Sequence, residues 1–414
     1  MRGFRKETAI LMYNGTVKNA NEIVIGDIIM GDDSTERKVL NVIHSRGKLF
    51  KVEPTDSTMP YYCTIDSIFC LKNNTSPKLS VEKGKYPRYR VRYLESYQDE
   101  YPNYTLTKLK HKTYNYHYHE DTKDHQYEKA KIDLERVFSE YHEGFPLHEL
   151  EMVHYLEQKG GFYNQIVFYR TGIEFNNPIN QELSPYLLGA WLGDGTSLDT
   201  VITNIDQELI DYLYEEANRM GLRIHRGHDT EKGRGSLNYR FTSGIRKEGS
   251  NKFMTFLKVN KLLGNKHIPD HYKINTRENR LALLAGLIDT DGHYNIECNY
   301  YVIVQKNKVL SYDIAFLIRS LGFWCHIRPV KSGCMYKGEM RMGDYFSISF
   351  AGKNLSEIPI LLPRKIAPLQ LHHRRKNEMH FKANITEDRI DDCYQFELSG
   401  NHRFVLADFK VVHD

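Results

Sequence analysis

Two apolar segments in the second half of the chain end in the same way. Residues 186–195 read YLLGAWLGDG and residues 284–292 read LAGLIDTDG. Ser184 and Pro185 offer an N-cap and a helix-compatible first position before the first segment. An Asp-Gly pair suits the end of a helix. The pattern therefore predicts two apolar helices that end at Asp194 and Asp291, 97 residues apart.

The sequence that follows each predicted helix repeats in the same order. Each copy has a segment with helical spacing, then a strand-like segment, then a Lys-x-x-Pro sequence. In the first copy these are residues 206–220, residues 239–242 and the sequence that begins at Lys266. In the second copy they are residues 309–321, residues 346–350 and the sequence that begins at Lys365. The two lysines come 72 and 74 residues after their aspartates. This order predicts a duplicated mixed α/β unit of about 95 residues.

Composition limits the classes of protein. A length of 414 residues predicts two to three domains, and 40% hydrophobic with 27% charged residues is typical of a globular chain. A net charge of +4 means that any basic surface must be local. The start has no apolar signal segment, and six cysteines without a C-x-x-C disfavour a disulfide scaffold or a cysteine zinc site. We expect an intracellular protein, nuclear if the host is eukaryotic.

The two aspartates carry the candidate chemistry. Gly189 and Gly286 would let the two predicted helices pack closely, so that both Asp-Gly ends meet at one pole. Two carboxylates at negative helix ends repel each other, and a divalent cation between them would relieve this. We predict Mg²⁺, with Mn²⁺ as a substitute, at Asp194 and Asp291 with Gly193 and Thr290 beside them. The alternative is that Asp-Gly only ends each helix.

The lysines of the two Lys-x-x-Pro sequences are candidate catalytic partners. Lys266 and Lys365 could lower the pKa of a metal-bound water or neutralise a phosphate. The alternative is ordinary surface lysine before a proline-containing loop. With two metals, such a site would hydrolyse a phosphodiester.

At these residues the chain resembles the two-repeat LAGLIDADG homing endonucleases. LAGLIDTDG departs from the motif that names the family only at Thr290, and LLGAWLGDG is similar to the more diverged first-repeat form. The resemblance implies an α+β fold with αββαββα-like halves related by a pseudo-twofold axis. It implies catalytic, metal-binding roles for Asp194 and Asp291, and catalytic roles for Lys266 and Lys365.

The two ends of the chain resemble the Hint domain of inteins, a mostly-β splicing domain. Of the four key splicing positions, three carry a residue that differs from the active pattern: Gly3, Ser67 and Asp414. The fourth, His413, is kept, and Thr64 of the T-x-x-H block is also present. Glycine has no nucleophile, and an Asp carboxylate is a poor substitute for an Asn amide that must cyclise. We therefore expect a scaffold that has lost splicing, whether naturally or by engineering; an ordinary β domain is the alternative.

The predicted domain order is a split Hint domain at 1–75 and 385–414, an insertion at 76–180, and the endonuclease at 181–384 with halves 181–275 and 276–384. The insertion interleaves tyrosines with basic residues, and an alternating strand would place Arg88, Arg90 and Arg92 on one face. Further candidate DNA contacts are Arg223, Arg226, Arg234, Arg240, Arg328, Lys331, Arg374 and Arg375. A solvated surface is the alternative for these groups.

These features predict a monomeric, metal-dependent endonuclease that cuts both strands of double-stranded DNA at a long asymmetric site. Three alternatives stay open: a DNA-binding protein of the same fold without cleavage, such as a maturase or repressor; an active splicing element; and a free-standing relative of the yeast mating-type switching endonuclease. The last is disfavoured because the chain has too few cysteines for that enzyme's zinc region.

Overall fold

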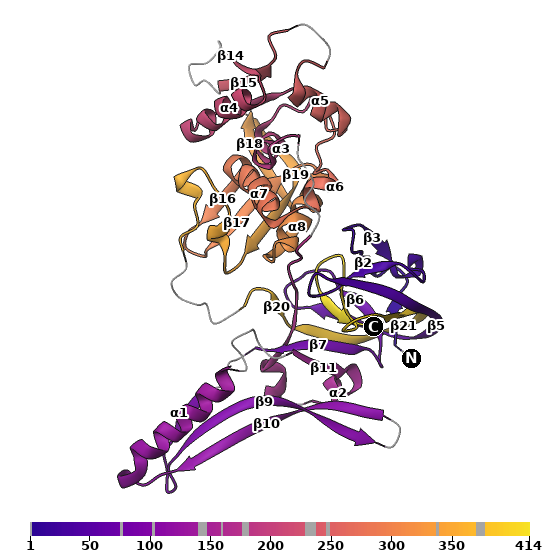
Figure 1. The fold of residues 1–414 in the computed structure, drawn as a ribbon, viewed down its shortest axis with the longest axis vertical. Helices are drawn as coiled ribbons and strands as arrows, with labels where there is room; N and C mark the ends of the chain where they lie inside the picture. The colour runs from indigo at the N-terminus through magenta and orange to yellow at the C-terminus, as the bar shows by residue number, and fades with distance from the viewer. Residues whose placement is uncertain are drawn as a thin grey trace. The chain divides into compact units, whose positions relative to one another are not determined.

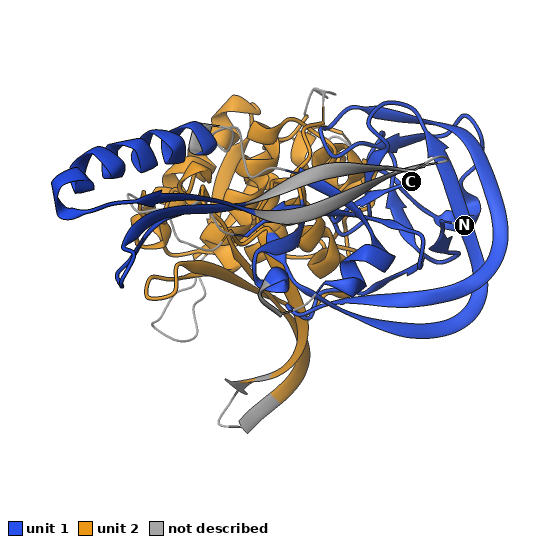
Figure 2. Ribbon diagram, turned by 90° about the horizontal axis from the view of Figure 1, so that it is seen from below, with its two compact units in different colours: residues 1–170, 380–414 blue, residues 171–379 orange. Residues whose placement is uncertain are grey.

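The computed structural model describes residues 2–74, 78–101, 104–139, 147–158, 160–175, 182–227, 237–245, 249–336, 339–369 and 377–414. The chain forms two compact units, drawn in separate colours in Figure 2. Unit 1 contains residues 1–170 and 380–414, and unit 2 contains residues 171–379. No helix among the described residues is long and apolar enough to cross a membrane.

Unit 1 is built around two long strands from opposite ends of the chain (Figure 1). Strand β5 (Glu36–Pro54) pairs antiparallel with β21 (Ala383–Leu398), and the register shifts at two places, between Glu387 and Ile390 and between Glu397 and Leu398. The same sheet includes β1 (Phe4–Arg5), β6 (Tyr61–Thr64) and β4 (Ile28–Met30), in the order β21-β1-β6-β5-β4. Short hairpins accompany this sheet: β2 (Ala9–Leu11) with β3 (Val17–Asn19), and β22 (Arg403–Val405) with β23 (Val411–His413); the turn η1 is Ala20–Glu22.

A second sheet of unit 1 joins its middle segments to its last ones. Its order is β11-β7-β12-β20, with bounds Leu147–Glu151, Ile68–Asn73, Ile166–Tyr169 and His380–Phe381. Helix α2 (Met152–Glu157) and η3 (Gly160–Asn164) lie between β11 and β12. Because β12 and β20 pair, the chain leaves unit 1 and returns to it on neighbouring strands.

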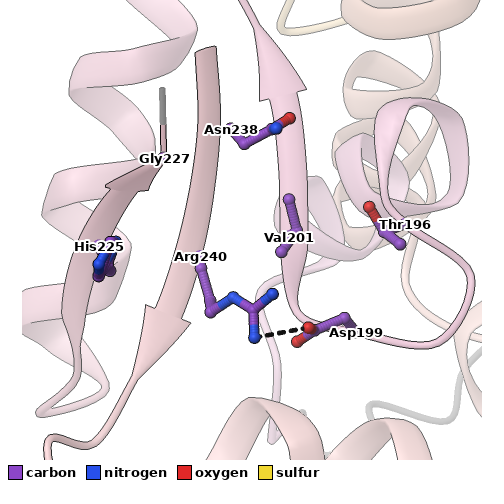
Figure 3. A pocket seen from close by; sticks show the side chains of 7 residues that line it. All are labelled: Thr196, Asp199, Val201, His225, Gly227, Asn238 and Arg240. Atoms are coloured by element: carbon purple, nitrogen blue, oxygen red, sulfur yellow. Dashed lines mark ion pairs between the residues drawn. The ribbon is translucent and has the colours of Figure 1, made fainter. Parts of the chain in front are cut away.

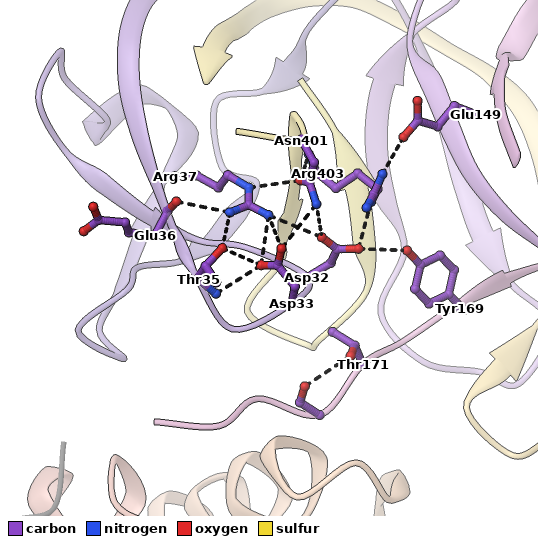
Figure 4. A network of polar contacts seen from close by, with 11 residues as sticks. Asp32, Asp33, Thr35, Glu36, Arg37, Glu149, Tyr169, Thr171, Asn401 and Arg403 are labelled. Carbon is purple, nitrogen blue, oxygen red and sulfur yellow. Dashed lines mark hydrogen bonds and ion pairs between the residues drawn. The ribbon is translucent and has the colours of Figure 1, made fainter. Parts of the chain in front are cut away.

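A polar network ties the β4–β5 turn to the C-terminal hairpin (Figure 4). Asp32 accepts hydrogen bonds from Arg403 Nε at 2.8 Å and from Asn401 Nδ2 at 3.1 Å. Arg403 also pairs with Glu149 of β11 at 2.8 Å, and Arg37 binds Asp33 at 2.9 Å. Hydrogen bonds from both sides fix the arginines, so the ends of unit 1 are held by charge as well as by the core.

The third sheet of unit 1 carries the tyrosine-rich segment. Strands β8 (Lys78–Glu82), β9 (Arg88–Tyr101) and β10 (Tyr104–His117) pair in the order β10-β9-β8. Turn η2 (Glu120–Thr122) leads into helix α1 (Lys123–Ser139), which packs on this sheet. Tyr89, Val91 and Tyr118 form a small core with Ala130 of α1. Tyr89 and Tyr118 are therefore on the side that α1 covers, whereas Tyr86 is 70% exposed.

Unit 2 contains two similar halves, each opening with an apolar helix (Figure 1). The first half has α3 (Pro185–Asp194), β13 (Val201–Asn204), α4 (Gln207–Arg219), β14 (Arg223–Gly227), β15 (Leu237–Thr242), α5 (Lys252–Val259) and α6 (Asp270–Lys273). The second has α7 (Arg277–Asp291), β16 (Gly292–Asn295), β17 (Tyr300–Gln305), α8 (Lys308–Ser320), β18 (Trp324–Tyr336), β19 (Glu339–Ala351), η4 (Leu355–Glu357) and η5 (Pro363–Lys365).

The halves differ in one strand. The first sheet has the order β13-β15-β14, whereas the second has β16-β17-β19-β18. The counterpart of β16 in the first half is a single bridge between Gly195 and Ile202. The predicted helices at 206–220 and 309–321 are confirmed as α4 and α8, and the structure is the mixed α and β fold that the sequence predicts.

Candidate active site

Two glycines allow α3 and α7 to touch along their backbones. A Cβ atom placed on Gly189 would lie 2.2 Å from the backbone oxygen of Leu283, and one placed on Gly286 would lie 2.2 Å from the backbone oxygen of Tyr186. No side chain larger than hydrogen fits at either position. The close approach that the sequence predicts is therefore present, and the helices pack in the centre of one continuous core.

The close packing brings the two Asp-Gly ends together. A Cβ atom on Gly193, the residue before Asp194, would lie 3.4 Å from the carboxyl carbon of Asp291. Burial raises the pKa of both carboxyls, and the charge of Asp194 raises that of Asp291 further, to about 6. Two partly buried carboxylates that repel each other favour a bound cation.

Each aspartate is held by an amide that the sequence analysis missed. Asn204 Nδ2 donates to Asp194 Oδ2 at 3.0 Å, and Gln305 Nε2 donates to Asp291 Oδ2 at 2.6 Å. Asn204 ends β13 and Gln305 ends β17, and each comes two residues before the N-cap of the next helix. This shared position in the repeat is the signal that could have revealed them.

The two predicted lysines lie at the same helix ends. Lys266 Nζ donates to the backbone oxygens of Leu192, Gly193 and Gly195, at 3.0, 3.2 and 2.7 Å. An ammonium group has three hydrogens, so these carbonyls use all of them. Burial lowers the pKa of Lys266 to about 8, while the charges of Asp291 and Asp194 oppose that fall.

Lys365 repeats this arrangement in the second half. Its Nζ donates to the backbone oxygens of Ile288, Asp289 and Thr290, at 2.8, 2.9 and 3.3 Å. Burial lowers its pKa, and the charge of Arg364 lowers it further. Both cations thus neutralise the negative end of the helix that carries the neighbouring carboxylate.

The donor set fits a divalent metal that also binds a substrate phosphate. One oxygen of each aspartate is taken by an amide, while Oδ1 of each makes no hydrogen bond among the described residues. Within those same residues, no cluster of three or more His, Cys, Asp or Glu could hold a metal. Mg²⁺ commonly uses one or two carboxylates with phosphate oxygens and water, so two carboxylates suffice.

Gly193 and Thr290 lie beside the carboxylates as predicted, and both are involved in packing. The Thr290 hydroxyl donates back to the Gly286 carbonyl at 2.9 Å, which leaves it turned toward its own helix. A Cβ on Gly193 would come within 2.1 Å of that hydroxyl oxygen. A metal-binding role for these two residues stays a prediction.

Asp289, in the middle of the second motif, has a structural role that the sequence did not indicate. Its carboxylate accepts from the Tyr186 hydroxyl at 2.7 Å and from the backbone N–H groups of Leu361 and Leu362 at 2.8 and 3.2 Å. It therefore links α3, α7 and the segment before η5. The equivalent position in the first half is the apolar Leu192.

Strand register determines which face of the sheet each candidate DNA contact of the first half occupies. Tyr239 and Phe241 of β15 are buried, so Arg240 points to the opposite, outer face. Arg223 shares that outer face. Arg226 is opposite Tyr239 and therefore lies on the other face of the sheet from Arg223 and Arg240. DNA contact by these arginines stays a prediction. Arg234 lies outside the described residues.

Strand register also places the candidate DNA contacts of β18 and β9 on particular faces of their sheets. In β18, Cys325 and Ile327 face the core, so Arg328 lies on the outer face of the sheet. Lys331 lies on the same face as Cys325 and Ile327. In β9, the predicted single face of Arg88, Arg90 and Arg92 is confirmed by the burial of the residues between them. Glu82 pairs with the first two of these arginines, and Arg92 is exposed. Arg374 and Arg375 lie outside the described residues.

The N-terminal splicing positions come together in unit 1. Thr64 N donates to the Gly3 carbonyl at 3.0 Å, and the hydroxyls of Thr64 and Ser67 are 3.3 Å apart. A Cβ on Gly3 would lie 3.2 Å from Cys393 Cβ and 3.3 Å from the Tyr394 carbonyl oxygen. A nucleophilic side chain at position 3 would therefore require a small shift of these neighbours.

The C-terminal positions form a second cluster. The Asp414 carboxylate accepts hydrogen bonds from Leu398 N at 2.8 Å and from His402 Nδ1 at 3.0 Å, and His413 Nδ1 is 3.3 Å from it. Although burial raises the pKa of Asp414, these hydrogen bonds lower it below the usual value. The carboxylate is therefore ionised at neutral pH.

Comparison with known families identifies the first third of the chain. Residues 3–139 match the family described as Hom_end-associated Hint, and the match runs through the tyrosine-rich sheet to the end of α1. The chain resembles the intein-type homing endonucleases. It is 24% identical over 367 residues to the homothallic switching endonuclease of Saccharomyces cerevisiae, which covers 75% of this chain and 59% of that protein.

A second curated relative matches a shorter region. The chain is 37% identical over 142 residues to the replicative DNA helicase DnaB of Mycobacterium intracellulare, covering 34% of this chain and 19% of that protein. The chain thus spans between a fifth and three fifths of these two relatives. Among solved structures, the homing endonuclease I-DmoI in complex with DNA and Ca covers 44% of this chain and 95% of its own, at 16% identity. The TM-score of this match is 0.29.

Proposed function

We propose that this intein-type homing endonuclease relative is a site-specific, metal-dependent endonuclease that cuts both strands of double-stranded DNA. The observation that carries the proposal is the meeting of Asp194 and Asp291, one from each half, at the joined ends of α3 and α7. A surface with one acidic centre and two unequal halves suits a long asymmetric DNA site read by a monomer. The similarity to the homothallic switching endonuclease supports the same activity.

The residues divide the work as follows. Asp194 and Asp291 would hold Mg²⁺ or Mn²⁺, which would supply an activated water and stabilise the leaving oxygen. Asn204 and Gln305 orient the two carboxylates through Oδ2 and leave Oδ1 available. Lys266 and Lys365 donate all their hydrogens to carbonyls, so they act through positive charge and helix position rather than by donating to phosphate.

A cleavage assay tests this proposal. The target is first selected from a random DNA library in Mg²⁺, and then Asp194→Asn and Asp291→Asn are compared with the parent protein. We expect each substitution to remove double-strand cleavage, while the control Asp211→Asn, at an exposed position of α4, cleaves like the parent. Cleavage by the double variant at the parental rate would refute the proposed site. Binding without cleavage by the parent in Mg²⁺ and Mn²⁺ would favour the DNA-binding alternative.

We further propose that unit 1 is a Hint scaffold that no longer splices. Position 3 offers no nucleophile, Ser67 is an uncharged donor bonded to Thr64, and Asp414 is an ionised carboxylate. With the chain placed between two reporter segments, we expect no ligated product. A ligated product from the parent sequence would refute the loss. Substitutions Gly3→Cys, Ser67→His and Asp414→Asn together are the matched restoration.

A further inference from the structure

The outer face of the β13-β15-β14 sheet contains a hollow of about 520 Å³ (Figure 3). It is lined by Thr196, Asp199, Val201, His225, Gly227, Asn238 and Arg240, all labelled in Figure 3. The buried residues Tyr239 and Phe241 point the other way, so these side chains stand on the face that the core does not use. The hollow can therefore take part in recognition without disturbing the fold.

Arg240 is held by a carboxylate at this hollow. Its Nη1 lies 2.9 Å from Asp199 Oδ2, as the dashed line in Figure 3 shows, and its side chain is 56% exposed. This ion pair uses one nitrogen of the guanidinium, and the Arg240 side chain lines the hollow. Arg240 makes no other hydrogen bond or ion pair among the described residues, so its remaining N–H groups are available to donate to a ligand.

Asp199 is itself fixed by the active-site helix. Its Oδ1 accepts from Thr200 N at 2.7 Å, and its backbone oxygen accepts from Trp191 Nε1 at 2.8 Å. Trp191 is fully buried in α3, three residues before Asp194. A side chain whose supports are rigid loses little freedom on binding, which is what a base-reading contact requires.

We propose that Arg240 reads one guanine in the half of the DNA site that the first repeat covers, and that Asp199 is its positioning residue; this rests on the proposed function. A guanidinium binds O6 and N7 of guanine with two parallel hydrogen bonds in the major groove. A neighbouring carboxylate reduces the attraction of the arginine for phosphate and preserves directed donation to a base. Arg223, on the same face, has no ion-pair partner among the described residues and suits a backbone phosphate.

The second half lacks this pair. In both sheets a histidine lies at the equivalent position: His225 opposite Arg240 in the first, and His326 opposite Ser349 in the second. Serine can contact any base edge and carries no strong preference. The guanine contact therefore belongs to one half of the site and contributes to its asymmetry.

The test is a base-preference profile. The selected target is randomised one position at a time, and binding is measured in Ca²⁺, which separates recognition from cleavage. We expect the parent protein to prefer guanine at one position by about tenfold or more. Arg240→Ala should abolish that preference and leave the others, and Asp199→Asn should weaken it. The control Arg223→Ala should lower affinity for all variants alike.

A second variant, Arg240→Lys, separates loss of the guanine contact from loss of the fold. Lysine keeps the positive charge but cannot make two parallel hydrogen bonds to guanine. It should retain overall affinity and lose the guanine preference. The proposal is overturned if Arg240→Ala lowers affinity equally for every variant, or leaves the profile unchanged. If the parent binds and cuts no member of the library, the proposed nuclease function itself fails. If the parent cuts its target but has no guanine preference that depends on Arg240, only the proposed Arg240 contact is refuted.

Discussion

Replacing Asp291 by asparagine should make the metal-free protein more stable while it removes nuclease activity. The carboxyl of Asp291 is partly buried, and Asp194 lies across the helix contact. Asparagine has nearly the same shape and can still accept the hydrogen bond from Gln305 Nε2. The substitution therefore removes one unfavourable charge and keeps the packing.

The pKa of Asp291 sets the size of this effect. Burial, with the charge of Asp194, raises it from 3.8 to about 6. At about 1.4 kcal/mol per pKa unit, ionised Asp291 costs the folded state about 3 kcal/mol at neutral pH. In a unit of this size, that corresponds to about 6–12 °C in Tm. Below pH 4 the carboxyl is protonated in both states and the cost is absent; it grows as the pH rises from about 4 to 6.

Thermal unfolding with EDTA at pH 4 and at pH 8 measures this difference. We expect Asp291→Asn to exceed the parent in Tm at pH 8 and to match it at pH 4. The control Asp211→Asn should stay within about 0.5 kcal/mol of the parent at both values. An equal gain at both pH values, or no gain at pH 8, would show that the two carboxylates do not lie in the environment described here.

Three further substitutions test other parts of the structure. In urea unfolding, Gly189→Ala should destabilise the fold by more than about 3 kcal/mol, because its Cβ would overlap the backbone of α7. The control Gly84→Ala, which has open space around it, should be neutral, and equal stability of the two variants would contradict the helix contact. Asp289→Leu should cost about 3 kcal/mol or more, because two backbone N–H groups and a hydroxyl lose their acceptor, and a neutral result in the same assay would exclude this link. Arg92→Ala should reduce the slope of log K against log salt concentration for DNA binding by about 0.9. Arg88→Ala should reduce this slope by less, because Glu82 already pairs with Arg88. A larger change for Arg88→Ala than for Arg92→Ala would show that Arg88, and not Arg92, contacts the phosphate.

The sequence predicted the parts of the fold that depend on local pattern. The helices at 206–220 and 309–321, the close packing at Gly189 and Gly286, and the meeting of the two Asp-Gly ends follow from spacing, capping and residue size. The repeat also singles out Lys266 and Lys365 as partners of the two aspartates, but it does not indicate that their ammonium groups bind backbone carbonyls at the helix ends.

What the sequence could not predict depends on strand register and on the reach of side chains. The amides of Asn204 and Gln305 meet the aspartates because two strands end beside two helix ends, and no local pattern specifies that distance. Arg223 and Arg226 are three residues apart in one strand and so face opposite sides, but which of the two faces the core depends on the pairing of β14 with β15. A shift of one residue moves a side chain to the other face.

Mn²⁺ binding to the protein–DNA complex tests whether Asp194 and Asp291 hold the catalytic metal. Free Mn²⁺ is titrated by electron paramagnetic resonance against the parent protein on a target with an uncleavable phosphorothioate at the scissile positions, and against the Asp194→Asn, Asp291→Asn double variant. We expect the parent complex to bind Mn²⁺, and we expect the double variant to bind the DNA but not Mn²⁺. Unchanged Mn²⁺ affinity in the double variant would contradict the assignment of these two carboxylates as the metal site.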